Sequence, residues 1–468
     1  MTLAGSFNRK PCRRQPDAFP WLRRTAGQHF ALVCLGILVG LCLNPGRCHS
    51  QDSLPAGRNR LSPSDPGASP ADATSEDTSP ADAAPADAAP ADAASTDAAS
   101  TDASDVFAAS PLTSVTIRSD LGEQQLVGRV LVQAADGGLL LEEPGGRIRQ
   151  FAPAALIGQQ LTSQPFVPHA AAALSAELKQ QAGAEFQCIS TDHYVICSDG
   201  NPIFAEMCGR LLETVHDRFF EFFRGSHSIT LRPLQGHLPV MVFSSVEDYR
   251  RFAADQHPDV DFADTPGYYS VRDNQILLTE MVSAAAELRS ESAIRRKLSQ
   301  SPRQIATIVH EAVHQLAFNT GLHVRLADNP LWLTEGLAVW FEPASPRAKL
   351  LWSRPGQVNP VHHPAFQHFS RGGRLHVPLE GLLSANESFA GEKTVAAAYA
   401  ESWALTAYLI RHHRRGYDRL LARVAARKPL IVVSAEERLT EFQDSVGRSL
   451  HEIDDALIPF VARLRAER

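Results

Sequence analysis

The pentapeptide HEAVH at residues 310–314 restricts the structure of this chain more than any other feature. On an α-helix, residues four positions apart lie on one face about one turn from each other, so both imidazoles can reach one Zn²⁺ at roughly 2.0–2.1 Å. The surrounding run, from Ile305 to Phe318, has apolar residues at helical spacing, and Gly321 suits a C-terminal helix end. The pattern therefore predicts a helix that carries a metal ion.

Glu311 lies beside the two histidines, His310 and His314. Zn²⁺ lowers the pKa of a bound water towards about 7, and a neighbouring carboxylate can then take its proton. We therefore expect Zn²⁺ on His310 and His314, with Glu311 as the general base. Because an HExxH pattern also arises by chance in a chain of this length, a third protein ligand is needed to support the site.

Glu335 is the favoured third ligand. It follows His314 by 21 residues within NPLWLTEGLAVWFEP, a run that predicts a second apolar helix starting after residue 330. A carboxylate among apolar residues is costly unless it is paired or binds a metal. The alternative is His323, but the segment HQLAFNTGLH departs from the HxxGxxH pattern that a third histidine requires.

At these residues the chain resembles the gluzincin peptidases, in which a glutamate on a downstream helix completes an HExxH site. More narrowly, it resembles a largely uncharacterised family of exported gluzincins common in planctomycete-type bacteria. The resemblance spans roughly residues 185–465 and includes DHYVICSD, VFSSVEDY, GYYSVRDNQILL and YAESWALTAYL. It implies a zincin-like (thermolysin-type) catalytic domain, one Zn²⁺ ion on His310, His314 and Glu335, and hydrolysis of a peptide or protein substrate.

The resemblance also suggests a catalytic role for Tyr399, because related gluzincins have a downstream tyrosine whose hydroxyl donates to the tetrahedral oxyanion. A core or boundary aromatic residue is the alternative. Some gluzincins place an acid four residues after the ligand glutamate to orient a histidine; here that position is Val339. We therefore expect support from Glu342 or a backbone carbonyl. The exopeptidase motif of the Gly-Ala-Met-Glu-Asn type is absent, which argues against an aminopeptidase.

Other polar residues in this part of the chain receive simpler interpretations. We interpret Glu401 as a solvated or capping acid. His362-His363 and His412-His413 are interpreted as loop or surface histidines, since adjacent residues point to different faces of a helix or strand. The hairpin predicted for GYYSVRDNQILLT could present an edge strand above the zinc for an extended peptide, with an ordinary core hairpin as the alternative.

The N-terminal part predicts export. A basic leader precedes the apolar run FALVCLGILVGLCL at residues 30–43. This run suits a signal-peptide core better than a membrane span of about 20 residues, although an uncleaved signal anchor at residues 1–50 is the alternative. Either one would place the remaining chain outside the cytoplasm. Residues 51–110 follow as a disordered Ala/Pro/Asp-rich linker, in which Asp recurs every five residues from Asp72 onwards.

Two folded parts are expected after the linker. Four β-rich runs separated by glycine-containing turns predict a small β accessory domain at residues 111–160, which we interpret as a binding or spacing domain. Residues 165–468 contain strands first, the metal-bearing helix next and helices last, apart from an irregular stretch near 343–390. This order indicates an α+β fold. The formal net charge of −7 and the lack of a basic patch exclude nucleic acid as an expected partner.

Two cysteines of the main domain lie on adjacent β-rich runs. Cys188 and Cys197 occur in EFQCIS and HYVICS, which a tight Thr-Asp turn joins. A cross-strand disulfide and a pair of buried thiols are both compatible with this arrangement, because the strand register decides between them. Cys208 leaves an odd number of cysteines in this part of the chain.

Together these features predict an exported zinc-dependent peptidase in which Glu311 is the general base. The alternative, from a different class, is a tethered, zinc-stabilised, non-catalytic binding protein of the cell envelope. A structural envelope protein with a vestigial site is a third interpretation, which the complete set of ligands and base disfavours. The residues support the zinc site better than they support a particular substrate.

Overall fold

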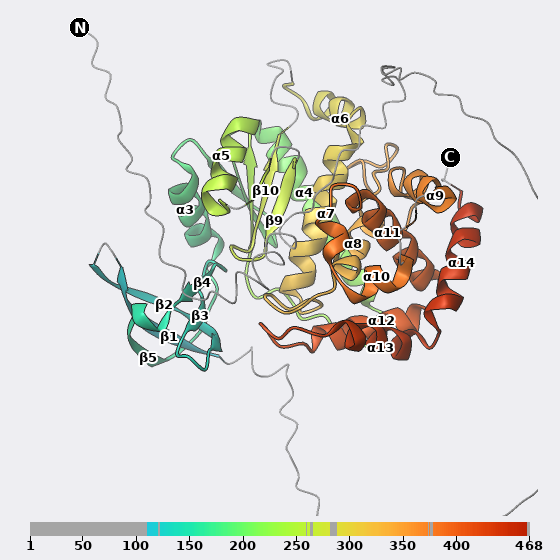
Figure 1. Ribbon diagram of the computed structural model, residues 1–468. Coiled ribbons are helices and arrows are strands. Elements are labelled where there is room, and N and C mark those ends of the chain that lie inside the picture. Colours follow the sequence, from blue (N-terminus) through green and yellow to red (C-terminus); the bar gives the residue numbers. More distant parts are fainter. Residues whose placement is uncertain are drawn as a thin grey trace, which may run out of the picture. The chain divides into compact units, whose positions relative to one another are not determined.

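The computed structural model describes residues 110–119, 122–258, 260–262, 265–280, 288–372, 374 and 378–465 (Figure 1). The predicted signal segment at residues 1–50, with its apolar run, and all but the last residue of the predicted linker lie outside these residues. Among the described helices, none has both the length and the apolar character that a membrane crossing requires. The described elements form an α+β fold, as predicted.

A small β module opens the described chain. Its strands follow one another in the sheet order β4-β3-β2-β1-β5, with antiparallel neighbours. The strands are β1 (Pro111–Ser119), β2 (Gly122–Gln133), β3 (Leu139–Glu142), β4 (Ile148–Phe151) and β5 (Leu156–Pro165). The prediction of four strands missed β5. Most of its side chains are exposed, so it lacks the alternation of buried and exposed residues by which a strand is recognised.

The second sheet is mixed and has the strand order β6-β7-β8-β10-β9. Its strands are β6 (Gln187–Ser190), β7 (Tyr194–Ser198), β8 (Leu238–Phe243), β9 (Gly267–Ser270) and β10 (Gln275–Thr279). The central strands β7, β8 and β10 run parallel, and the β6-β7 and β9-β10 pairs are the two predicted antiparallel hairpins. Within the described residues, β9 is therefore an edge strand.

Helices cover both faces of this sheet because successive strand residues point to opposite sides. Val195 and Met241 belong to one apolar cluster with α3 (Ala171–Ala182) and α5 (Val246–Gln256). Their neighbours Ile196 and Val240 belong to the other, larger cluster. That cluster includes residues of α4 (Pro202–Phe223), α6 (Glu291–Ser299) and α7 (Pro302–Asn319). As a result, α7 packs directly against β9 and β10.

The remaining chain is helical. It contains α8 (Leu331–Phe341), α9 (His362–Gly372), α10 (Pro378–Ser384), α11 (Val395–His412), α12 (Arg414–Ala425), α13 (Ala435–Val446) and α14 (Leu450–Arg463). The stretch near 343–390, predicted to be irregular, in fact contains α9 and α10. Both helices are short, and α9 is rich in histidine and polar residues, which made its helical periodicity hard to recognise.

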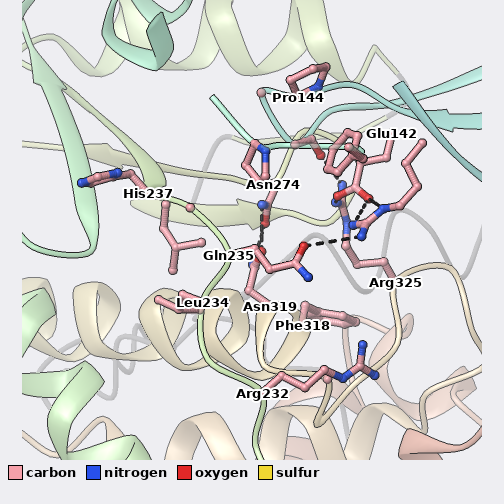
Figure 2. A pocket seen from close by; sticks show the side chains of 18 of the residues that line it. Glu142, Pro144, Arg232, Leu234, Gln235, His237, Asn274, Phe318, Asn319 and Arg325 are labelled. Atoms are coloured by element: carbon pink, nitrogen blue, oxygen red, sulfur yellow. Dashed lines mark hydrogen bonds and ion pairs between the residues drawn. The ribbon is translucent and has the colours of Figure 1, made fainter. Parts of the chain in front are cut away.

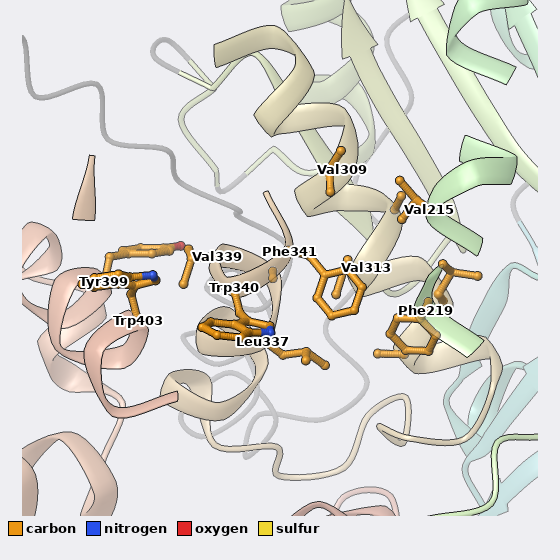
Figure 3. Close-up of a cluster of buried hydrophobic side chains, with 14 of the residues drawn as sticks. Val215, Phe219, Val309, Val313, Leu337, Val339, Trp340, Phe341, Tyr399 and Trp403 are labelled. Carbon is orange, nitrogen blue, oxygen red and sulfur yellow. The ribbon is translucent and has the colours of Figure 1, made fainter. Parts of the chain in front are cut away.

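The core around α8 brings separate parts of the chain together. Every residue of α8 is buried, and the helix packs against α7 on one side and α11 on another. Figure 3 shows Val313 of α7, Phe341 of α8 and Phe219 of α4 near one another. A Cβ atom at Gly336 would collide with Thr406 and lie 3.0 Å from the Ser402 carbonyl oxygen. The glycine thus permits close contact between α8 and α11.

The two cysteines of the first hairpin form a disulfide. Cys188 and Cys197 occupy directly opposed positions in the antiparallel β6-β7 register, and their Cα atoms are 4.0 Å apart. The register that the sequence left open therefore brings the two sulfur atoms together. Cys208 is a buried free thiol on α4, where burial strongly raises its pKa.

Candidate metal centre

Helix α7 places His310 and His314 one turn apart on the side that faces α8. Pro302 occupies the first turn of the helix, where its missing N–H has no intrahelical acceptor in any case. Both histidines are buried, with 1% and 3% of their surface exposed. Their Nε2 atoms lie 3.1 Å apart. The HEAVH segment thus forms the helical histidine pair that its spacing predicts.

Helix α8 brings Glu335 to the same point. One carboxylate oxygen lies 3.2 Å from His310 Nε2, and the other lies 3.5 Å from His314 Nε2. The ligand atoms of a tetrahedral zinc site with bonds of roughly 2.0–2.1 Å are about 3.3 Å apart. The three side chains therefore have the geometry of a site that could hold a metal ion. Burial alone would raise the pKa of Glu335, but His314 and His310 lower it to about 2, so the carboxylate is ionised.

Glu342 contacts the ring nitrogen of His310 that does not face the ligand group. Its Oε2 atom lies 3.0 Å from Nδ1 of His310, the ring nitrogen that faces away from Glu335. Asn359 donates a hydrogen bond of 2.6 Å to the other carboxylate oxygen. This contact at Nδ1 orients the ring of His310, so that a metal ion would bind at Nε2. Burial alone would lower the pKa of His310, but the hydrogen bonds with Glu335 and Glu342 raise it well above its usual value, so a metal ion at Nε2 would take the place of a proton. The contact at Nδ1 confirms that Glu342 orients His310, a role that the apolar side chain of Val339 cannot fill.

His362 joins this group, which corrects its interpretation as a loop or surface residue. It is 8% exposed, its Nε2 atom lies 3.4 Å from Oε1 of Glu342, and its ring stacks on Tyr399. The side chain of Asn359 accepts the backbone N–H of His362 and so fixes the start of α9 above the site. His412 is exposed and His413 is partly exposed, in agreement with the prediction for that pair.

Glu311 is fully buried beside the ligand group. The backbone N–H of Tyr269 on β9 donates a hydrogen bond of 2.8 Å to its Oε2 atom. Its Oε1 atom has no hydrogen-bond partner among the described residues. Burial raises the pKa of Glu311 to about 8, and the charge on Glu335 acts in the same direction, whereas His310 opposes the shift. The structure thus places a carboxylate with raised proton affinity next to the metal ligands.

Tyr399 also reaches the site, from α11. Its hydroxyl forms a hydrogen bond with Glu335, and its ring packs edge-on against Phe389. Burial and then the Glu335 charge raise the pKa of Tyr399 well above its usual value, so the phenol keeps its proton. The residue is therefore a hydroxyl donor at the metal centre, as well as a buried aromatic.

Glu401 has different surroundings from those predicted, whereas His323 lies outside the ligand group, in agreement with the preference for Glu335. Glu401, interpreted as a solvated or capping acid, is instead fully buried and forms an ion pair with Arg374 at 3.0 and 3.1 Å. His323, the alternative third ligand, is buried but is not part of the ligand group. Its ring packs against Phe318, and both ring nitrogens lack hydrogen-bond partners within the described part of the chain.

A second group of metal-ligating side chains went unnoticed in the sequence. His193, Glu213 and His216 also have ligand atoms within 4.8 Å of one another. These residues are only partly buried, and Glu213 already accepts hydrogen bonds from both the backbone and the ring of His193. The i, i+3 spacing of Glu213 and His216 on α4 was the only signal in the sequence. We treat this group as a structural hydrogen-bond cluster.

These features define an α+β protein with a buried His–His–Glu group that could hold a metal ion. A DUF1570 domain, from a family described as "Protein of unknown function", is found at residues 304–431. This segment contains all three residues of the ligand group, together with Glu311, Glu342 and Tyr399. A comparison with curated proteins gave no match to the chain.

Proposed function

We propose that this protein is a zinc-dependent peptidase of the gluzincin type. The observation that carries the proposal is the buried group of His310, His314 and Glu335, whose ligand atoms are separated by 3.1–3.5 Å. Two imidazoles and one carboxylate form the protein ligand set of catalytic zinc sites such as that of thermolysin. The α+β order and the edge strand β9 beside α7 agree with a zincin-like domain.

The residues around the ligands suggest how hydrolysis would proceed. A bound Zn²⁺ supplies a Lewis acid that polarises a water molecule and the carbonyl of the scissile peptide bond. Glu311 in its ionised form would accept a proton from that water as the water oxygen bonds to the carbonyl carbon, and would deliver the proton to the amine nitrogen as the C–N bond breaks. Tyr269 holds one oxygen of Glu311, while the other oxygen has no partner among the described residues. Tyr399 donates its hydroxyl to the oxyanion.

The proposed location of the protein is outside the cytoplasm. The apolar run at residues 30–43 would act as a signal peptide or a membrane anchor, followed by the linker. The disulfide between Cys188 and Cys197 supports this location because disulfides persist in oxidising compartments. The substrate would then be an extracytoplasmic peptide or protein.

Metal content and cleavage of purified protein test the proposal. The full chain should contain one Zn²⁺ per molecule by mass spectrometry and cleave members of a broad peptide library. The variant Glu311→Gln should keep the metal and lose at least about 100-fold in cleavage rate, since it removes the proton acceptor. Equal cleavage by wild-type protein and Glu311→Gln would show that the mechanism is wrong.

A tethered, zinc-stabilised binding protein is the alternative. The observation that favours it is burial, because the side chains of His310, His314 and Glu335 are at most 4% exposed. In that case the metal would stabilise the α7-α8 core and the β module would recognise a partner. Tightly bound zinc without turnover of any library peptide would support this alternative.

A further inference from the structure

A cavity of about 210 Å³ borders both the β module and the main domain (Figure 2). Its walls come from β2, β3 and the segments that follow them, from residues 232–238, which include the first residue of β8, and from the C-terminal end of α7. Phe166, Leu234 and Phe318 provide apolar surface. Part of the cavity lining is therefore apolar.

The charged side chains of the lining carry an excess of positive charge. Arg129, Arg232 and Arg325 line the cavity, against one carboxylate, Glu142. Glu142 is shared, since Arg129 Nε donates to one oxygen at 2.9 Å and Arg325 Nη1 lies 3.1 Å from the other. Two guanidinium groups thus contact Glu142, the one carboxylate among the described residues that line the cavity, and Arg232 adds a third positive charge.

Arg232 is held at the end of α7. Its backbone N–H donates to the carbonyl oxygen of Thr320 at 2.9 Å. Its guanidinium lies over Gly321, where an added Cβ atom would come within 2.7 Å of Nε. Burial and the nearby charge of Arg129 lower the pKa of Arg232, so the two guanidinium groups repel each other. An anion between them would relieve this repulsion.

His323 connects the cavity with the metal centre. It lines the cavity and is 1% exposed, and both of its ring nitrogens lack hydrogen-bond partners in the described structure. It is also close enough to His314 and Glu335 for their charges to act on it. A ligand oxygen in this part of the cavity would give its ring N–H an acceptor. Through His323, the wall of the cavity is thus within electrostatic range of the site at which we propose peptide cleavage.

We propose that this cavity binds a carboxylate of a peptide ligand, supplied either by an acidic side chain or by the C-terminus. Guanidinium groups suit this chemistry because their planar N–H donors match the two carboxylate oxygens. The apolar walls would contact the aliphatic part of the same residue. The binding of a carboxylate does not depend on the proposed function. Only the statement that the bound peptide is a substrate rests on it.

Peptide binding to the full-length Glu311→Gln variant, loaded with Zn²⁺, tests this site without cleavage. Three fluorescent peptides share one sequence except at the last residue: glutamate with an amidated C-terminus, glutamine with a free carboxylate, and glutamine with an amidated C-terminus. One of the two peptides with a carboxylate should bind at least about tenfold more tightly than the neutral peptide. Which of them does so identifies the source of the carboxylate.

Arg232→Gln, made in the same background, should remove this preference, whereas Arg232→Lys should keep part of it. Arg118→Gln, an exposed change on β1, is the matched control and should keep the full preference. Far-UV circular dichroism checks that each variant is folded. Equal affinity for all three peptides, no measurable binding, or an unchanged preference in Arg232→Gln would overturn the proposal.

The peptide-binding result and the cleavage result can be told apart. Selective binding of a carboxylate peptide that wild-type protein fails to cleave would support the cavity and contradict the peptidase. Cleavage by wild-type protein without any carboxylate preference would contradict the cavity proposal alone.

Discussion

Nδ1 of His310 lies 3.0 Å from the Oε2 atom of Glu342. Glu342 is the first residue after α8, the helix that carries Glu335. Helix α8 and its C-terminal neighbour therefore supply one metal ligand and the group that orients another. The two acids are seven residues apart, about two helical turns, so both face α7. The geometry of the site thus depends on how α8 packs against α7.

We expect Glu342→Gln to weaken metal binding while the protein remains folded. The neutral amide no longer stabilises the His310 tautomer that presents Nε2 to the metal, and loss of such support typically lowers affinity by 10- to 100-fold. Competition with a zinc-binding dye measures the change. Glu436→Gln, at an exposed position of α13, is the control. Equal affinity of Glu342→Gln and wild type would show that Glu342 has no part in metal binding.

Removal of the metal should destabilise the main domain. Without an ion, the buried acids Glu311, Glu335 and Glu342 lie close to one another, and the charges of Glu335 and Glu342 add to the effect of burial in raising the pKa of Glu311. A ligand at 100 times its Kd stabilises the folded state by about 2.7 kcal/mol. Addition of a chelator should therefore lower the melting temperature in differential scanning calorimetry, and zinc should restore it. His314→Ala should melt at the same temperature with and without chelator.

Tyr399→Phe distinguishes two roles for the phenol at the metal centre. If its hydroxyl donates to the oxyanion, the variant should keep its metal and lose roughly 100-fold in kcat with little change in KM. If the hydroxyl only orients Glu335, with which it forms a hydrogen bond, metal affinity should fall instead. Titration with zinc and steady-state kinetics on the same preparation separate these results. Unchanged metal affinity together with unchanged kcat would exclude both roles.

The sequence predicted the parts of this site that depend on local spacing. HEAVH formed a helical histidine pair, and the charge of Glu335 in an apolar helix correctly indicated a buried, partnered carboxylate. His362 and Glu401 could not be placed in this way, because their burial depends on contacts with Glu342 and Arg374, which are distant in sequence. Neither periodicity nor composition reports such contacts.

The elements of the fold also divide into those that the sequence predicted and those that it did not. Strands of the β module such as β1 were predicted from β-rich runs between glycine-containing turns, and helix α7 was predicted from apolar residues at helical spacing. The exposed strand β5 and the short helix α9 lack a clear pattern and were missed. The cavity beside Arg232 was also beyond sequence reasoning, since its walls come from segments far apart in the chain.

Asp273 provides a prediction about stability in acid. It is buried in the β9-β10 turn, where Arg147 Nε lies 2.6 Å and Arg272 Nη2 3.1 Å from its carboxylate, and Ser270 donates a further hydrogen bond. Burial alone would raise its pKa, but Arg272 and Arg147 lower it from 3.8 to about 2. Between these two values the unfolded chain binds more protons than the folded protein. The stability that this ion pair contributes is therefore present at neutral pH and is lost as the pH falls from about 4 to 2.

Asp273→Asn tests this assignment. The shift in pKa corresponds to roughly 2 kcal/mol, so the variant should unfold with a free energy lower by about that amount at pH 7. The difference from wild type should decrease as the pH falls below 4, because protonation of Asp273 then removes the same charge. Urea unfolding at pH 7, 5 and 3 measures the profile. A difference that stays constant over this range would show that the loss comes from packing and not from the charge of Asp273.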